Sequence, residues 1–180
     1  STTTTTDIVK AWRSLSPKAI VLMDNRSLAL YRQARSLVGD TATPVVALMG
    51  VRVDIAVAGL RNAVGIGYEI PAVTSMTNLR SALVESPRRI GVVYRASWSD
   101  FIRRQAAFCA SEDFALVGRA VPEDADAASS LRKALSELLE VEKVDALWIL
   151  NDNMFLNPRI IQSVWIPVTR RYKTVSVVGV

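Results

Sequence analysis

The stretch "RIGVVYRASWSDFIRRQ", residues 89–105, decides the fold class. It begins with an apolar, β-branched run that ends at Tyr94, as in a buried strand. A short polar segment follows, and from Ser99 onward apolar and charged residues alternate at helical spacing. The stretch therefore predicts a strand, a loop and a helix in succession, which is the first part of a βαβ unit.

The same alternation of short apolar runs and amphipathic stretches extends through most of the chain. Strands that are apolar on both faces and separated by helices indicate parallel sheets covered by helices on each side. We therefore predict an α/β fold of doubly wound parallel sheets in Rossmann-like lobes. The expected strands cover 19–23, 44–50, 63–70, 89–94, 114–121, 144–150 and 174–180, and the expected helices cover 25–39, 52–60, 72–86, 99–113, 124–142 and 157–172.

A boundary between two lobes is expected near the middle of the chain. Glycine and proline residues gather within 59–71, and the strand–helix pattern becomes more regular after Pro87. We place the boundary at about 70–87. The expected division is a leader or first helix over 1–15, part of an N-terminal lobe over 16–75, a crossover over 76–87, and a C-terminal lobe, complete or truncated, over 88–180.

Composition narrows the classes of function. The chain has 22 Lys and Arg against 17 Asp and Glu, but its basic residues are scattered, which indicates a solvated surface and not a nucleic-acid interface. The absence of histidine removes histidine-based acid–base pairs and most catalytic zinc sites. The single cysteine, Cys109, lies among apolar residues and is expected to be a buried thiol. No cluster has metal-ligand spacing, so we predict no enzyme activity, no cofactor and no metal site.

Four polar loops follow expected strands. In doubly wound sheets, ligands bind beyond the carboxyl ends of the strands, where loops lead into helices. The N–H groups at those helix N-termini favour anionic groups. The candidate ligand-binding residues are Asp24, Asn25, Arg26 and Ser27 after the first strand, Met49 and Gly50 after the second, Arg95, Ser97, Trp98 and Ser99 after the fourth, and Asn151, Asp152 and Asn153 after the sixth.

Other interpretations of these loops stay open. Ser, Asp and Asn before a helix are common N-caps, so a single loop of this kind is also explained as a cap. An α/β enzyme with a carboxylate site at Asp24 or Asp152 is a further hypothesis, but Asp152 has no partner acid or nucleophile in its segment and is expected to orient a donor. No glycine-rich phosphate loop follows the first strand, which argues against dinucleotide or nucleoside triphosphate binding.

Several segments, taken in order, resemble a known family. They are "KAIVLMDNRSLAL" (18–30), "TPVVALMG" (43–50), "AGLRNAVGIGYEIP" (58–71), "SPRRIGVVYRASWSDF" (86–101) and "VEKVDALWILNDNMF" (141–155). Over 16–180 the chain resembles the substrate-binding proteins of ABC transporters, including tryptophan- and tyrosine-type components, which have the type I periplasmic-binding-protein fold. The resemblance implies two α/β lobes that close over a small molecule, with ligand loops at the positions already named.

Two departures from the family pattern bear on specificity. The segment "DNRS" (24–27) puts two charges where the family tends to have a small turn, and Arg95 stands where the family often has asparagine. The resemblance then implies an amino-acid-like or other anionic ligand in a cleft between lobes. Arg26 or Arg95 would bind its charged group, and Trp98 or Phe155 would pack on its side chain.

The resulting hypothesis is an extracytoplasmic, periplasmic-type component that presents a small organic ligand to an ABC permease. The alternative is a ligand-sensing domain fused to a membrane-bound signalling protein. The family has a secretion signal and further strands outside this stretch, so we expect a partial chain of a longer protein. Missing strands would expose sheet edges, and we expect a homodimer formed through those edges.

Overall fold

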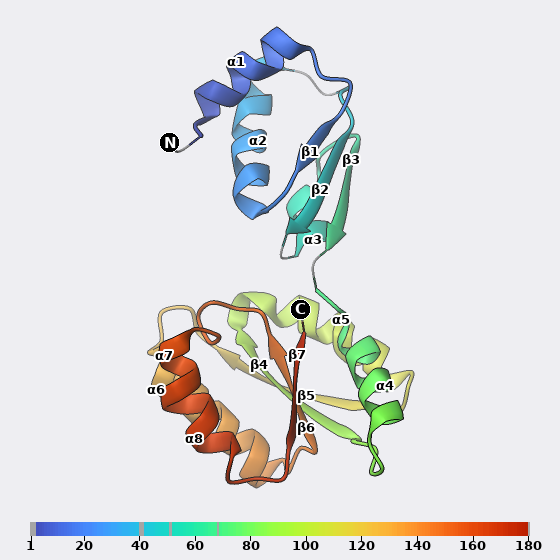
Figure 1. Cartoon of the computed structure of the whole chain (residues 1–180), viewed down its shortest axis with the longest axis vertical. Coiled ribbons are helices and arrows are strands. Elements are labelled where there is room, and N and C mark those ends of the chain that lie inside the picture. Colours follow the sequence, from blue (N-terminus) through green and yellow to red (C-terminus); the bar gives the residue numbers. More distant parts are fainter. Residues whose placement is uncertain (1–2, 40–41, 51, 68, 180) are drawn as a thin grey trace. The chain divides into compact units, whose positions relative to one another are not determined.

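The computed structural model describes residues 3–39, 42–50, 52–67 and 69–179. The chain divides into two compact units, Ser1–Glu69 (unit 1) and Ile70–Val180 (unit 2), and each is described by itself (Figure 1). Unit 1 contains α1 (Thr5–Leu15), β1 (Ile20–Leu22), α2 (Asn25–Val38), β2 (Val45–Gly50), α3 (Val53–Val57) and β3 (Ala63–Gly67).

Thr5 and Thr6 begin α1, and Thr4 is its N-cap. The hydroxyl of Thr4 accepts a hydrogen bond from the backbone N–H of Asp7, and the carboxylate of Asp7 accepts one from the backbone N–H of Thr4 at 2.9 Å. This reciprocal capping box satisfies two N–H groups that the helix cannot pair internally. Trp12 of α1 then stacks on Tyr31 of α2, with ring centroids 5.2 Å apart. The segment is therefore a packed first helix.

Unit 1 has a single layer of helices. Its three strands are parallel and lie in the order β1-β2-β3, and their core side chains pack against Trp12, Leu28, Tyr31 and Val53 from α1, α2 and α3. Right-handed crossovers are nearly universal, so strands added in one direction receive their connecting helices on one face. Figure 1 shows α1 and α2 together on one side of these strands.

The opposite face of this sheet is apolar and uncovered by the described helices. Val21, Val46 and Val64 are in register across the three strands, and Leu48 pairs with Ile66. Val21, Val64 and Ile66 are each more than half exposed. Unit 1 is thus wound on one face only, although its strands are apolar on both faces.

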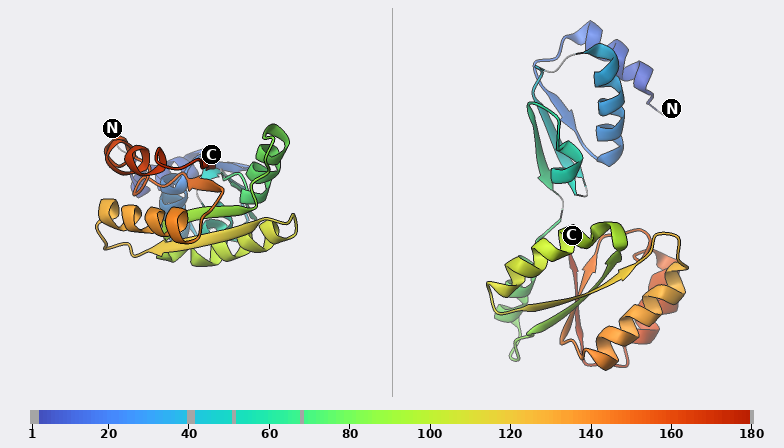
Figure 2. Two further views of the ribbon diagram at one scale, coloured as in Figure 1. Left: turned by 90° about the horizontal axis from the view of Figure 1, so that it is seen from below. Right: turned by 180° about the vertical axis from the view of Figure 1, so that it is seen from behind.

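Unit 2 is wound on both faces of its sheet. Its parallel strands lie in the order β5-β4-β6-β7, so the chain moves one way from β4 to β5 and the other way through β6 to β7. This reversal puts α5 on one face and the later helices on the other (Figures 1 and 2). The elements are α4 (Ala72–Ala82), β4 (Arg89–Arg95), a 3-10 turn (Ala96–Trp98), α5 (Ser99–Ala110), β5 (Ala115–Val121), α6 (Ala127–Ser136), a π-helical turn (Glu137–Val141), β6 (Ala146–Leu150), α7 (Pro158–Ile160), a second π-helical turn (Ile161–Trp165), α8 (Ile166–Thr169) and β7 (Val175–Gly179).

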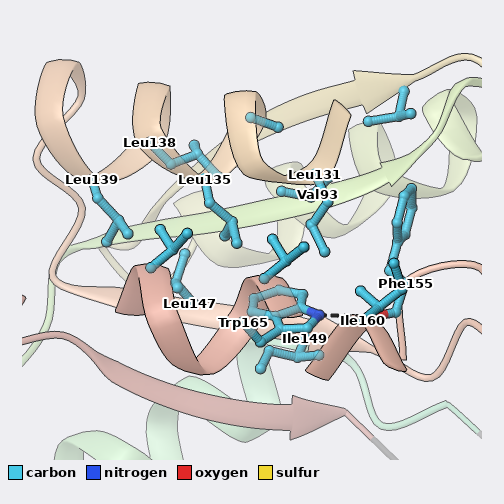
Figure 3. Close-up of a cluster of buried hydrophobic side chains, with 14 of the residues drawn as sticks. Val93, Leu131, Leu135, Leu138, Leu139, Leu147, Ile149, Phe155, Ile160 and Trp165 are labelled. Carbon is cyan, nitrogen blue, oxygen red and sulfur yellow. Dashed lines mark hydrogen bonds between the residues drawn. The ribbon is translucent and has the colours of Figure 1, made fainter. Parts of the chain in front are cut away.

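Leucines of α6 and of the π-helical turn after it fill a core of unit 2. Leu131, Leu135 and Leu138 are fully buried and pack against Leu147 and Ile149 of β6 (Figure 3). Their spacing is the stripe expected of a helix that packs on a sheet. Asp126 is the N-cap of this helix and accepts a hydrogen bond from the N–H of Ser129 at 2.8 Å.

The helical segment after β6 is irregular around Pro167. Proline has no N–H to donate to the carbonyl four residues earlier, which belongs to Ser163. That carbonyl instead accepts a hydrogen bond from the guanidinium of Arg132 at 2.8 Å. A π-helical turn precedes the proline, and the helix ends at Thr169.

The predicted α/β fold of parallel sheets is confirmed. Each predicted strand and helix has a counterpart, and most differences are one to four residues at the ends, where caps and turns decide the boundary. Tyr68 and Val180, which the sequence assigned to strands, lie outside the described residues. In the described part of the chain, every helix is too short or too polar to cross a membrane.

Candidate ligand-binding site

The loop after β1 is first of all a helix cap. The carboxylate of Asp24 accepts the backbone N–H of Ser27 at 2.6 Å, and the hydroxyl of Ser27 accepts the backbone N–H of Asp24 at 3.1 Å. Hydrogen bonds from the backbone and side chain of Ser27 lower the pKa of Asp24. Asp24 and Ser27 therefore serve α2, whereas Asn25 and Arg26 are exposed in its first turn.

Gly50, at the end of β2, lies next to Asn25, at the start of α2. A Cβ atom on Gly50 would lie 2.6 Å from Oδ1 of Asn25, so only glycine allows this approach without moving the amide. Met49 beside it has a left-handed backbone, with φ at 54°, at a register shift between Leu48 and Gly50. A bulge of this kind redirects the chain at the end of a strand.

Glu69, after β3, joins the same edge of unit 1. Its Oε1 accepts the backbone N–H of Arg52, which also has a left-handed φ of 52° and precedes α3. Sequence reasoning did not name Glu69. It follows a strand, as the predicted residues do, and the same rule applied to the third strand would have included it.

In unit 2, the loops after β4 and β6 meet through an ion pair. Arg95 donates from Nε to Oδ2 of Asp152 at 2.7 Å, and from Nη2 to Oδ1 of the same carboxylate. The two strands are neighbours, and the order of strands reverses between them. Arg95 and Asp152, 57 residues apart in sequence, therefore bridge the topological switch point, where open α/β sheets bind ligands.

Asp152 is held inward by its own loop. Its side chain is only 1% exposed, and Oδ1 also accepts the backbone N–H of Met154 at 2.8 Å. Its backbone carbonyl accepts N–H groups from Phe155 and Leu156. The indole N–H of Trp165 donates to the carbonyl of Phe155 at 2.8 Å, which ties this loop to the core (Figure 3).

The neighbours of Asp152 differ from it in exposure. The side chains of Asn151 and Asn153 are both exposed, so the three residues alternate between outward, inward and outward positions. Phe155, predicted to pack on a ligand, is 2% exposed and belongs to the core. The loop thus presents two amides and conceals its carboxylate and its aromatic ring.

The loop after β4 binds a second carboxylate, which belongs to Glu123. The backbone N–H of Ser97 donates to Glu123 at 3.0 Å, and hydrogen bonding to Ser97 lowers the pKa of this carboxyl. Glu123 follows β5 and was another residue that sequence reasoning missed. Ser99 donates its hydroxyl to the carbonyl of Ala96 at 2.7 Å, which stabilises the start of α5.

Trp98 is part of the core on the α5 side of the sheet. It is 9% exposed and packs edge-on against Phe101, which in turn lies against Trp148. Trp98 was expected to pack on a ligand, whereas its ring packs against other aromatic rings of the protein. The indole N–H of Trp148 is buried and has no hydrogen-bond partner in the part of the chain that the structure describes.

The side chains at the carboxyl ends of the strands in both units are suited to hydrogen bonding. Asp24 is committed to a cap and Asp152 to an ion pair. Burial raises the pKa of the Cys109 thiol to about 11, so this group is a protonated part of the core and a poor nucleophile. Over residues 3–39, 42–50, 52–67 and 69–179, no three His, Cys, Asp or Glu side chains gather as they would around a metal ion.

Comparison with solved structures shows that other proteins have a similar fold. The chain is 19% identical to the ABC domain from Streptococcus pneumonia in complex with L-Trp, with a TM-score of 0.52 over 88% of this chain and 56% of that one. It is 18% identical to a conserved domain protein from Vibrio cholerae, with a TM-score of 0.56 over 97% of this chain and 57% of that one.

A third similar structure is the ligand-free, open form of a substrate binding protein with adhesive properties from Clostridium difficile. The identity is 18% and the TM-score 0.57, over 84% of this chain and 50% of that one. This chain therefore spans 50–57% of the length of these three proteins, and the likeness is one of fold. No protein-family model matches the chain, and no curated protein matches it in sequence.

Proposed function

We propose that this chain is part of an extracytoplasmic solute-binding protein, with an ABC permease as its partner. The observation that carries the proposal is the set of polar side chains at the carboxyl ends of parallel strands, among them Asn25 in unit 1 and Asn151 and Asn153 at the switch point of unit 2. Ligands of α/β sheets bind at such positions. Two of the similar structures support the same class of function, because one is in complex with L-Trp and the other is a substrate binding protein.

The proposed ligand is a small organic molecule, with amino acids as the first compounds to test because the Streptococcus protein is in complex with L-Trp. We propose binding without catalysis. The strand-end aspartates are occupied within the protein, and the chain has no histidine to act as a general base. A ligand that binds the folded chain alone must raise its melting temperature.

The test is a thermal-shift screen of the purified chain, followed by titration calorimetry. The compounds are the L-amino acids, dicarboxylic acids and monosaccharides. We expect one chemical class to stabilise the chain with one molecule bound per chain. Asn153→Ala should weaken that ligand about tenfold, which corresponds to the ~1.4 kcal/mol of one hydrogen bond.

The matched control is Asn78→Ala, an exposed asparagine on α4 of the same unit. It should leave binding unchanged. The proposal is wrong if no compound class raises the melting temperature, or if the control weakens binding as much as Asn153→Ala does.

A further inference from the structure

We infer that Arg95 and Asp152 neutralise each other as an internal ion pair, and that the switch point of unit 2 therefore takes a neutral hydrogen-bonding group of the ligand and not an anionic one. The inference rests on the proposed solute-binding function and adds a ligand class to it. It makes Arg95 a positioning residue, although an exposed arginine beside a strand end is a usual receptor for carboxylates and phosphates.

The geometry of the pair leaves little of the Arg95 guanidinium available to an anion. Two nitrogen atoms of the guanidinium donate to the two oxygen atoms of one carboxylate, which is the fork-to-fork arrangement of a strong pair. Asp152 is 1% exposed and Arg95 is 35% exposed, so the carboxylate lies on the protein side and the guanidinium covers it. A ligand anion would have to draw Arg95 away and leave a buried carboxylate without its counter-charge, which proteins strongly disfavour.

The surrounding charge also opposes an anion. Glu123, held by Ser97, adds a second negative charge whose field reaches Arg95. The Arg95 guanidinium is thus influenced by two carboxylates, and these three side chains together have a negative balance of charge. The hydrogen bond with Asp152 raises the pKa of Arg95, so the guanidinium stays charged throughout the neutral range.

Two of the exposed side chains at this edge are amides. Asn151 and Asn153 flank Asp152 and are exposed, and each amide offers both donors and an acceptor. The loop that holds them is fixed by Asp152 itself and by the hydrogen bond from Trp165 to Phe155. Such groups match an amide, a hydroxyl or a carbonyl of a ligand.

The test observes the Nε–H resonance of Arg95 by NMR, assigned with Arg95→Lys, while inorganic phosphate or N-acetyl-L-tryptophan is added. Arg103, whose side chain is 77% exposed, is the reference in the same spectrum. We expect the Arg95 proton to exchange with water at least tenfold more slowly than that of Arg103, and to keep its position as either anion is added. In Asp152→Asn, exchange should accelerate at least tenfold and phosphate should shift the resonance.

The inference is overturned if the Arg95 Nε proton of the wild type exchanges with water as fast as that of Arg103. It is also overturned if the Arg95 resonance shifts when either anion is added. This wild-type result decides the matter even if Asp152→Asn does not fold. Failure of the proposed function gives a different result, because the ligand screen then finds no binding while the ion pair stays protected. An anionic compound that binds the wild type and loses affinity in Arg95→Lys also overturns the inference.

Discussion

Replacing Trp165 by phenylalanine should destabilise unit 2 and loosen the loop that contains Asn151 and Asn153. The indole N–H donates to the buried carbonyl of Phe155 at 2.8 Å. Without it, that carbonyl is left unpaired at a cost of about 1–3 kcal/mol. The smaller ring also leaves a void of about three heavy atoms, which adds about 2–3 kcal/mol at roughly 1 kcal/mol for each methyl-sized gap. We expect a total loss of about 3–6 kcal/mol.

Trp148→Phe is the matched control for this change. Trp148 is in the same unit, is 1% exposed, and loses the same part of its ring system. Its N–H has no hydrogen-bond partner among the described residues, so its removal breaks no hydrogen bond and relieves a buried, unsatisfied donor. The difference between the two variants therefore isolates the hydrogen bond from the void, and should be at least about 1 kcal/mol.

The assay is urea unfolding followed by circular dichroism, with hydrogen exchange of the Phe155 and Leu156 amides as a local measurement. Trp165→Phe should accelerate exchange of both amides, which donate to the carbonyl of Asp152. Trp148→Phe should leave both amides protected. An equal or larger loss of stability in Trp148→Phe would refute the role given to the Trp165 hydrogen bond.

Three further changes test other features. Arg132→Ala should lower the free energy of unfolding in urea by about 1 kcal/mol. The loss should be smaller in a Pro167→Ala background, because alanine restores a backbone N–H. The pKa of the Cys109 thiol is about 11 in the folded chain, against an ordinary value of 9.0, so as the pH rises the unfolded chain loses the thiol proton before the folded chain does. The free energy of unfolding should therefore fall between about pH 9 and 11. Cys109→Ala should reduce this dependence on pH. Ile66→Lys, on the open face of the unit 1 sheet, should reduce binding of the dye ANS and any self-association seen by light scattering, and equal dye binding in both proteins would contradict that surface assignment.

The order of elements could be predicted because it depends on local pattern. Short β-branched runs such as 45–50 and 89–95 became strands, and the stripe of leucines in α6 became a core. The first helix was harder, since a run of threonines has low helix propensity. Its N-terminal signal, Thr4 followed three residues later by Asp7, was nevertheless present in the sequence.

The roles of the loop residues could not be predicted in the same way. Asp24, Asn25, Met49, Gly50 and the residues after β4 and β6 were placed correctly at strand ends, because parallel strands fix that edge. Whether a side chain points outward or inward depends on partners far away in sequence. The pairing of Arg95 with Asp152 and the burial of Trp98 are both of this kind, and neither has a local signature. Ligand contact by these residues, and a homodimer through sheet edges, stay predictions.

The one-sided winding of unit 1 has a consequence for how the chain unfolds. A sheet with helices on one face has half the layers that exclude water, whereas the sheet of unit 2 is enclosed above and below. As the denaturant concentration rises, the chain should therefore unfold in two stages, and unit 1 should unfold first. A protease added between those stages would leave a resistant fragment that begins near Ile70, the first residue of the second compact unit.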